Sequence, residues 1–168
     1  MELVDVFDNK RNSLNKVIER YNNNTPGEFT QVVHLWIQNS NGEFLIQKRS
    51  MKKKVHPGMW SITGGAVDSL EEPTTAVARE CKEEIGIELK PQDFELMMTV
   101  KRPSVFVDVY YAKKDIDFKD IVMQQDEVDD VKWASNAEIK DLIKQNEMGS
   151  SITIYYDALY KLIESNNG

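Results

Sequence analysis

GAVDSLEEPTTAVARECKEEIGI, at residues 65–87, combines a cluster of carboxylates with a stripe of apolar side chains. Glu80, Glu83 and Glu84 stand at i, i+3 and i+4, so a helix would place their carboxylates on one face. Like charges at this spacing repel one another unless a cation neutralises them, and hard oxygen ligands suit Mg²⁺ or Mn²⁺. The stretch therefore predicts a helix whose acidic face holds a divalent metal ion.

Clustered glutamates more often form a solvated helix face, and the opposite side of this helix decides between the two interpretations. That side carries an apolar stripe, which predicts that the helix is docked on a core and that its carboxylates have a fixed position. The members of the stripe are Thr74, Val77, Ala78, Cys81 and Ile85. Pro73 suits the first helical turn, and Gly86 suits the end of the helix.

The same stretch fits a known signature, G-x5-E-x7-R-E-U-x-E-E-x-G-U, in which U is an apolar residue. Its fixed positions are filled by Gly65, Glu71, Arg79, Glu80, Cys81, Glu83, Glu84, Gly86 and Ile87. The chain thus resembles the Nudix hydrolases, closely over this box (residues 65–87) and more loosely over about residues 29–142. Leu70 departs from the many members that have glycine there, and a leucine at this place can stiffen the loop.

Composition limits the classes of protein that fit the chain. Its 168 residues, 40% of them hydrophobic, predict a single domain over residues 1–168, with residues 1–28 as an N-terminal extension. The net charge of −7 and the pI near 4.9 argue against binding to a nucleic-acid polymer or an anionic membrane. Cys81 is the single cysteine, which excludes an intrachain disulfide. Without a signal-peptide pattern or a run of about 20 apolar residues, we expect a cytoplasmic protein.

Patterning along the rest of the chain predicts an α+β or mixed α/β fold. Strands are expected over residues 1–7, 29–37, 44–48, 94–100, 105–112 and 128–133, with a hairpin turn at residues 39–42. Helices are expected over residues 13–21 and 154–163, and another after Ser135, where Glu138 completes a capping box. The resemblance implies the specific version: an α/β/α sandwich in which a mixed β-sheet carries the box as a loop–helix–loop.

The resemblance also implies roles for the box residues. Glu80, Glu83 and Glu84 would ligate Mg²⁺ or Mn²⁺, together with the backbone carbonyl of Gly64. Arg79 belongs to the catalytic set, and we expect it to hold the acidic loop through Glu71 rather than to touch the substrate. Two candidates for the base that activates water stay open, Glu80 and Glu127. The acidic run around Glu127 is equally well explained as a solvated loop, but family members often place an acid shortly before a strand that ends in tryptophan, as Trp133 does here.

The basic segment KRSMKKKVHPGMW, at residues 48–60, is similar to the corresponding stretch of isopentenyl diphosphate isomerases, which are Nudix relatives. That similarity implies phosphate contacts for Arg49 and Lys53, and we prefer it to a purely solubilising loop because arginine binds phosphate in a bidentate manner. No cysteine stands near residues 60–65, where the isomerase needs one, so isomerase activity is disfavoured.

His34 and the remaining aromatic residues are better explained by packing than by substrate binding. His34 lies among apolar strand residues. His56, in a loop beside Pro57, fits contact with the substrate and a place in the loop equally well. Four aromatic residues suit a core more than a base-stacking site, namely Trp36, Trp60, Tyr155 and Tyr156.

The expected protein is therefore a Mg²⁺-dependent pyrophosphohydrolase that cleaves a diphosphate linkage in a small molecule, such as a nucleoside diphosphate derivative or nucleoside triphosphate. A non-catalytic nucleotide-sensing module is the alternative, with the isomerase a weaker one. The resemblance leaves a homodimer open as the oligomeric state.

Overall fold

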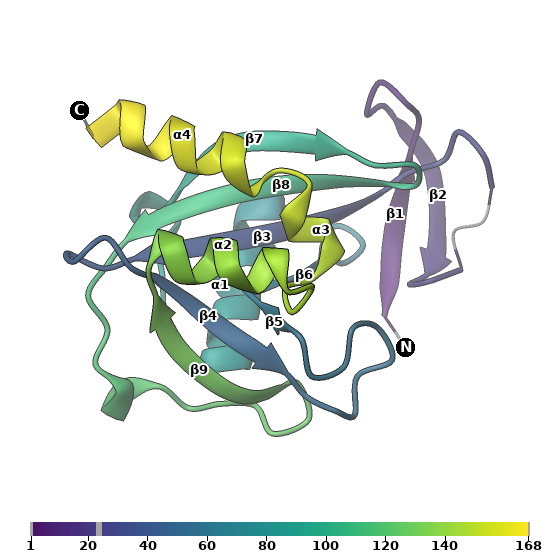
Figure 1. Ribbon diagram of the computed structural model, residues 1–168. Helices are drawn as coiled ribbons and strands as arrows, with labels where there is room; N and C mark the ends of the chain where they lie inside the picture. The colour runs from purple at the N-terminus through teal and green to yellow at the C-terminus, as the bar shows by residue number, and fades with distance from the viewer. Residues whose placement is uncertain (1, 23–24, 168) are drawn as a thin grey trace.

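The computed structural model describes residues 2–22 and 25–167, in which nine strands precede or alternate with the helices (Figure 1). The strands are β1 (Leu3–Phe7), β2 (Ser13–Glu19), β3 (Thr30–Gln38), β4 (Phe44–Arg49), β5 (Trp60–Ser61), β6 (Thr63–Ala66), β7 (Glu95–Lys101), β8 (Val105–Lys113) and β9 (Val128–Ala134). The α-helices are α1 (Pro73–Ile85), α2 (Asn136–Lys144), α3 (Ser150–Thr153) and α4 (Tyr156–Asn167), and two 3₁₀ turns lie at Pro91–Asp93 and Phe118–Asp120.

The central sheet is mixed, as expected. Its strands run in the order β5-β4-β3-β8-β7, with β6 also paired to β3 and β9 to β4. β3 and β8 are parallel, from Thr30 opposite Val105 to Gln38 opposite Lys113, and the other pairs are antiparallel. β3 therefore stands at the centre, where its neighbours fix the positions of the segments on both sides.

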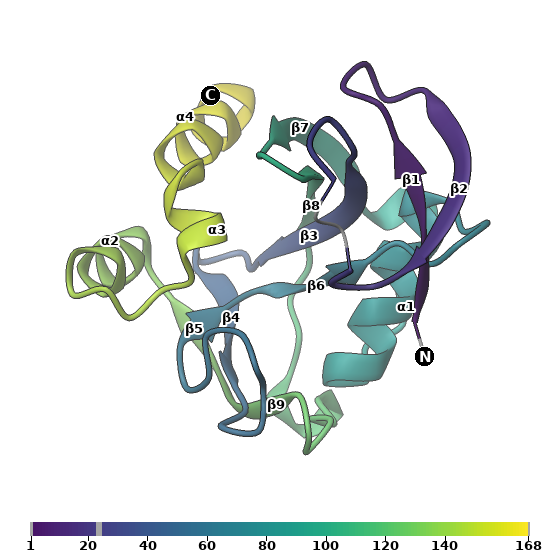
Figure 2. The same cartoon turned by 90° about the vertical axis from the view of Figure 1, so that its right-hand side faces the viewer.

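Helices cover both faces of this sheet, which confirms the expected α/β/α sandwich. Figure 2 shows α1 on one side of the sheet and α2, α3 and α4 on the other. The alternation of side chains along β3 explains the two cores: Val33, Leu35 and Ile37 pack with α1, whereas Trp36 packs with the other helices. No helix in the described part of the chain is both long and apolar enough to cross a membrane.

Helix α1 begins and ends where its sequence predicts. Pro73 is in its first turn, and Gly86 closes it with φ 73° while its N–H donates to the carbonyl of Lys82 at 3.0 Å. Val77, Cys81 and Ile85 are buried against the sheet, as expected. Burial raises the pKa of the Cys81 thiol to about 12, so this cysteine is a packing residue rather than a reactive one.

Most of the other predicted elements are confirmed. The hairpin turn joins β3 to β4, β7 pairs with β8, and β9 follows the acidic run. Ser135 caps α2, since its hydroxyl accepts the N–H of Glu138 at 3.2 Å. The helix expected over residues 154–163 is α4, which begins at Tyr156 after the short α3.

The helix predicted over residues 13–21 is wrong, because Ser13–Glu19 forms strand β2. It pairs antiparallel with β1, with Val4 opposite Ile18 and Val6 opposite Lys16. The apolar residues at helical spacing do not face a core: Leu14 is 41% exposed and Val17 is 49% exposed. Asn15 has a φ of 50°, so the strand is irregular at this residue. The buried valines of β1 need a paired neighbour, and this pairing overrides the local helical pattern.

Candidate active site

The carboxylate of Glu84 lies at the floor of the site. It is 6% exposed; Oε1 accepts the N–H of Gly64 at 3.0 Å, and Oε2 accepts the side-chain amide of Gln47. Burial raises the pKa of Glu84, and the negative charge of Glu80 raises it further, while the two donors oppose this shift. The acidic cluster is therefore held in a place where two negative charges repel each other.

Two glycines permit the close packing around this floor. Strand β6 runs along β3 with Gly64 opposite His34, and a Cβ on Gly64 would lie 2.3 Å from the carbonyl oxygen of Val33. A Cβ on Gly65 would instead lie 2.2 Å from Oε1 of Glu80. A Cβ would therefore meet a fixed backbone atom at Gly64 and the end of a flexible carboxylate side chain at Gly65.

Arg79 connects the two ends of the box. Its Nε and Nη2 donate to the two carboxylate oxygens of Glu71, at 2.8 Å and 2.9 Å, and Nη2 also donates to the carbonyl of Ala66 at 3.0 Å. Its Nη1 donates to Oε1 of Glu80 at 2.9 Å. This is the loop-holding contact with Glu71 expected from the sequence; a direct part in catalysis stays a prediction.

The three box glutamates share a helix face but differ in environment. Glu80 is mostly buried, and burial raises its pKa against the opposing charge of Arg79. Glu83 is 49% exposed on its side chain and lies 3.4 Å from Nη1 of Arg79. An incoming cation can therefore reach Glu83 from solvent, whereas Glu84 is approached only through the cavity.

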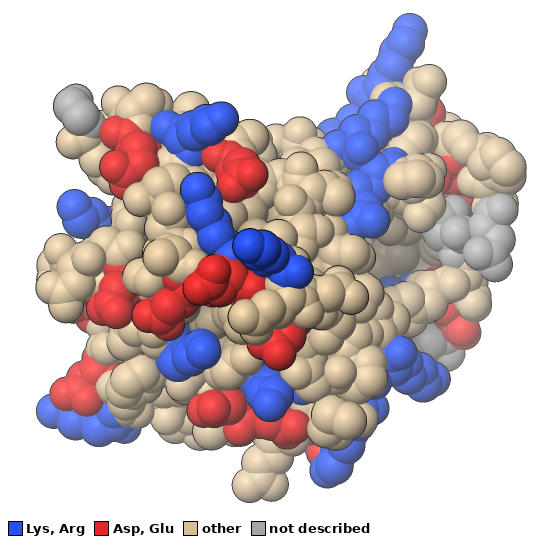
Figure 3. Space-filling model, viewed as in Figure 1, with Lys and Arg blue, Asp and Glu red and all other residues tan. Residues whose placement is uncertain are grey.

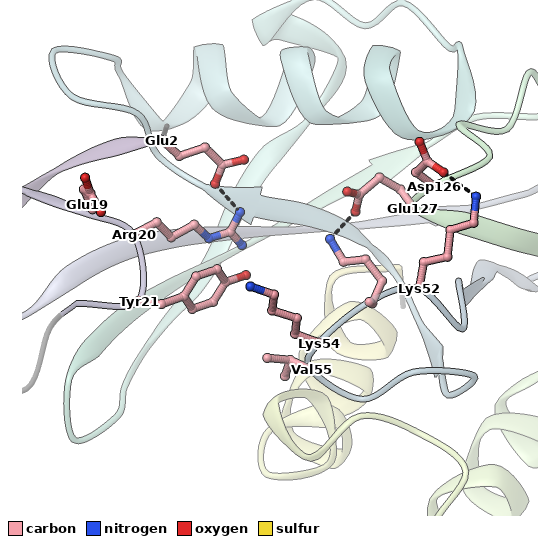
Figure 4. A pocket seen from close by; sticks show the side chains of 10 residues that line it. Glu2, Glu19, Arg20, Tyr21, Lys52, Lys54, Val55, Asp126 and Glu127 are labelled. Carbon is pink, nitrogen blue, oxygen red and sulfur yellow. Dashed lines mark hydrogen bonds and ion pairs between the residues drawn. The ribbon is translucent and has the colours of Figure 1, made fainter.

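The basic segment, predicted to bind phosphate, and the acidic segment, predicted to supply the base, lie next to each other. Strand β4 pairs with β9 so that Arg49 lies opposite Val128, and the N–H of Ser50 donates to the carbonyl of Glu127 at 3.0 Å. The ammonium of Lys53 donates to Oε2 of Glu127. Figure 4 shows a pocket between the basic loop and the N-terminal hairpin, with Glu127 on one side of it and Arg20 on the other.

A cavity of about 120 Å³, here called the box cavity, collects these groups. It is lined by Glu2, Arg20, Arg49, Lys53, Gly64, Gly65, Glu80, Glu83, Glu84, Gln124 and Glu127. Every residue that the sequence predicted to bind the metal ion, to contact phosphate or to act as the base lines this cavity. Arg79 does not line the cavity, but it donates a hydrogen bond to Glu80, which does.

Three of the lining residues were not predicted from the sequence: Glu2, Arg20 and Gln124. Glu2 and Arg20 belong to the N-terminal hairpin, where they form an ion pair at 2.7 Å. Asp5 fixes the hairpin to the box loop, because its carboxylate accepts the hydroxyl of Ser69 at 2.7 Å and the N–H of Leu70 at 3.0 Å. No local motif marks these residues: the docked hairpin brings Glu2 and Arg20 to the site, and the N–H of Gln124 donates to the carbonyl of Glu84 at 3.0 Å.

The histidine and aromatic residues set aside as packing residues are confirmed as such near the core. The hydroxyl of Tyr155 accepts the indole N–H of Trp36 at 2.9 Å and lies 2.7 Å from Nδ1 of His34. The hydroxyl of Tyr155 can then donate its own hydrogen to Nδ1 of a neutral His34. Burial lowers the pKa of His34 to about 4. Tyr156 is fully buried, and the Nζ of Lys132 lies 4.5 Å from the ring centroid of Trp60.

The donor set of the box cavity fits a hydrated Mg²⁺ or Mn²⁺ ion. In residues 2–22 and 25–167, no three His, Cys, Asp or Glu side chains are already placed to ligate one ion. Glu80 and Glu83 turn toward Arg79, and Glu84 turns toward its two donors. Mg²⁺ keeps several waters and takes only one or two carboxylates, so a closed cage is not required. Glu83, Glu84 and Glu80 would hold such an ion, with the carbonyl of Gly64.

Comparisons with known proteins bear on the family and the fold of this chain. A NUDIX domain model matches residues 28–153. An uncharacterized Nudix hydrolase of Listeria innocua is 30% identical over 168 residues, covering 99% of this chain and 96% of its own. An isopentenyl-diphosphate Delta-isomerase of Shigella flexneri is 29% identical over 110 residues, or 62% of this chain and 60% of the isomerase. A crystal structure from Deinococcus radiodurans has the same fold, with a TM-score of 0.80 at 21% identity, over 95% of this chain and 99% of that one.

Proposed function

This chain belongs to the Nudix family, and on that premise we propose that it is a divalent-metal-dependent pyrophosphohydrolase. It would cleave a diphosphate linkage in a nucleoside diphosphate derivative or a nucleoside triphosphate. The observation that carries the proposal is the box cavity, where the acidic cluster of α1 lies beside the cations Arg49 and Lys53. Carboxylates for a metal ion and cations for phosphate are the two sets of groups that this reaction needs.

A bound divalent ion would neutralise phosphate oxygens and lower the pKa of the attacking water. Arg49 and Lys53 would bind and orient the diphosphate. The Lys53–Glu127 ion pair links this binding to the base, because a phosphate that attracts Lys53 releases the carboxylate of Glu127. Glu127 is then free to accept a proton from water. Glu80, which also lines the box cavity, is the second candidate base.

The two alternatives are less well supported. A nucleotide-sensing module needs no metal cluster, yet Glu80, Glu83 and Glu84 all line the cavity. An isomerase would use a cysteine at the site, and the only cysteine, Cys81, is buried among the apolar residues that pack α1 on the sheet. The partial match to the isomerase therefore does not extend to its chemistry.

Product analysis with a Glu83→Gln variant tests the proposal. Glu83 is half exposed, so its substitution should leave the fold intact, and Glu88→Gln, at a more exposed glutamate outside the cavity, is the control. A panel of nucleoside triphosphates, ADP-ribose, dinucleoside polyphosphates and isopentenyl diphosphate would be incubated with Mg²⁺ or Mn²⁺, with and without chelator. Since outer-shell changes alone cost about 10–100-fold, we expect Glu83→Gln to lower turnover by at least about 100-fold.

Undiminished hydrolysis by Glu83→Gln would remove Glu83 from the metal site. Absence of any product, with Mg²⁺-dependent nucleotide binding intact, would instead identify the sensing module.

A further inference from the structure

A second cavity, here called the side cavity, opens next to the box cavity. It has a volume of about 430 Å³ and is walled by the end of β2, the middle of β3, the basic loop after β4, the β7–β8 turn and the start of α3. Figure 3 shows the molecule hollowed between the N-terminal hairpin and the sandwich, where these segments meet. Arg20 and Arg49 line both cavities, so the two cavities adjoin at these side chains.

The charge of the side cavity is opposite to that of the protein as a whole. The chain carries a net charge of −7, yet three arginines line this cavity, Arg20, Arg49 and Arg102. Among the described residues that line it, none is an aspartate or a glutamate. A cluster of guanidinium groups without carboxylates in an acidic protein indicates a site for an anion.

Two of these arginines have no carboxylate partner within the described ranges. Arg20 forms its ion pair with Glu2, but neither Arg49 nor Arg102 forms an ion pair with a described aspartate or glutamate. Arg49 donates through Nε to the carbonyl of Val55 at 2.9 Å, which fixes its side chain. Arg102 lies in the turn before β8, where its own N–H is bonded to the carbonyl of Val105 at 2.9 Å. Their positive charges are thus available to a ligand.

The charges of both arginines converge on the wall formed by β3. His34 lines this wall, and after burial the next causes of its lowered pKa are the charges of Arg102 and Arg49. Apolar groups complete the wall, among them Val32, Val105 and Val107. The cavity therefore suits a ligand with an apolar body and a negatively charged group.

We propose that the side cavity binds a phosphate monoester carried by the substrate beyond its scissile diphosphate, with Arg102 as the anion-binding residue and Arg49, which lines both cavities, between the two phosphate groups. This assignment rests on the proposed hydrolase for its placement, since the box cavity would hold the diphosphate itself. Lys53 and the metal ion would already neutralise that diphosphate, so Arg102 has no charge to balance unless the substrate carries a further anion. Guanidinium groups match a phosphate monoester better than a neutral sugar or base.

Equilibrium binding in chelator tests the assignment without turnover. The probes are matched pairs that differ by one phosphate monoester: ADP-ribose with ADP-ribose 2′-phosphate, and dephospho-coenzyme A with coenzyme A. We expect the wild-type protein to bind the phosphorylated member of at least one pair about 10-fold more tightly, since a charge-assisted bidentate contact contributes about 1.5–3 kcal/mol. Arg102→Gln should abolish this preference and leave the affinity for the unphosphorylated member within about 2-fold.

Two further variants separate a specific contact from general charge. Arg102→Lys keeps the charge without the bidentate fork, so it should retain only part of the preference. Lys161→Gln, on the exposed side of α4, removes the same charge far from the cavity and should retain the full preference. Equal affinity of the wild-type protein for both members, failure to bind either, or an equal loss for both members in Arg102→Gln would overturn the assignment. Hydrolysis that proceeds without any such preference would leave the proposed function standing and remove only the subsite.

Discussion

Replacement of Gly65 by alanine should separate the activity of this protein from its stability. The added Cβ would lie 2.2 Å from Oε1, 2.4 Å from Cδ and 2.9 Å from Oε2 of Glu80. These atoms are the end of a flexible side chain, so the carboxylate can rotate away while the backbone stays in place. Such a movement breaks the 2.9 Å contact between Glu80 and Arg79, a part-buried ion pair. We expect a loss of about 1 kcal/mol in the free energy of unfolding.

The loss of activity should be much larger. A group misplaced by about 1 Å can cost about 100-fold in rate, and the clash displaces a candidate ligand and base by at least that much. Turnover at saturating Mg²⁺ should therefore fall by about 100-fold or more, while urea unfolding shows the small change. Gly64→Ala is the contrasting variant to Gly65→Ala. Its Cβ would lie 2.3 Å from the backbone oxygen of Val33, and this atom cannot rotate away. That variant should lose several kcal/mol of stability.

A double-mutant cycle shows whether the clash with Glu80 is the cause. In a Glu80→Ala background the obstructing carboxylate is gone, so adding Gly65→Ala should change neither turnover nor stability further. If Gly65→Ala reduces turnover by the same factor with and without Glu80, the reasoning is refuted.

Two more predictions concern stability. Leu70 is 95% exposed and has a φ of 66°, so Leu70→Gly should stabilise the fold by about 0.5–1 kcal/mol in urea unfolding, because the left-handed strain exceeds the entropy lost by glycine. Leu70→Ala keeps the strain, and an equal gain in that control would contradict the explanation. His34 is neutral in the folded protein, with a pKa of about 4 against 6.5, so the unfolded chain binds more protons below pH 6.5 and stability falls as the pH drops toward 4. At pH 5 the lowered pKa of His34 should reduce the free energy of unfolding by about 2 kcal/mol. The free energy of unfolding of His34→Gln should therefore depend less on pH between 7 and 5. Parallel pH dependences of the wild-type protein and the variant would exclude His34 as the cause.

The box could be predicted from the sequence because its chemistry is local. Glu80, Glu83 and Glu84 belong to one helix, and the apolar stripe fixes which way that helix faces. The spacing does not show how deeply each carboxylate is buried, since burial depends on β4 and β6, whose Gln47 and Gly64 bond to Glu84. Charge pattern alone thus gives the three candidate ligands but not how accessible each one is to solvent or to a metal ion.

The N-terminal hairpin could not be predicted in the same way. Helical spacing over residues 13–21 is a local signal, and it is overridden by pairing with β1, whose valines are buried against the sandwich. Arg20 reaches the box cavity only because Asp5 binds Ser69 and Leu70 across more than sixty positions of sequence. A residue whose role depends on such a contact leaves no pattern in its own neighbourhood.

The contact between Lys53 and Glu127 is intermediate between the box, which could be predicted from the sequence, and the hairpin, which could not. Neither residue predicts the other, since they stand 74 positions apart. Once β4 and β9 are antiparallel neighbours, however, the end of β4 must lie beside the start of β9, and the register places Arg49 opposite Val128. The basic segment that leaves β4 and the acidic run that enters β9 are then forced together at one edge of the sheet. Opposite charges at such a junction stabilise the loop in the absence of substrate, and the same pair can be separated by a phosphate that competes for the lysine. The sheet register therefore makes Lys53 and Glu127 neighbours, and in the proposed mechanism the binding of a phosphate to Lys53 would release the carboxylate of Glu127.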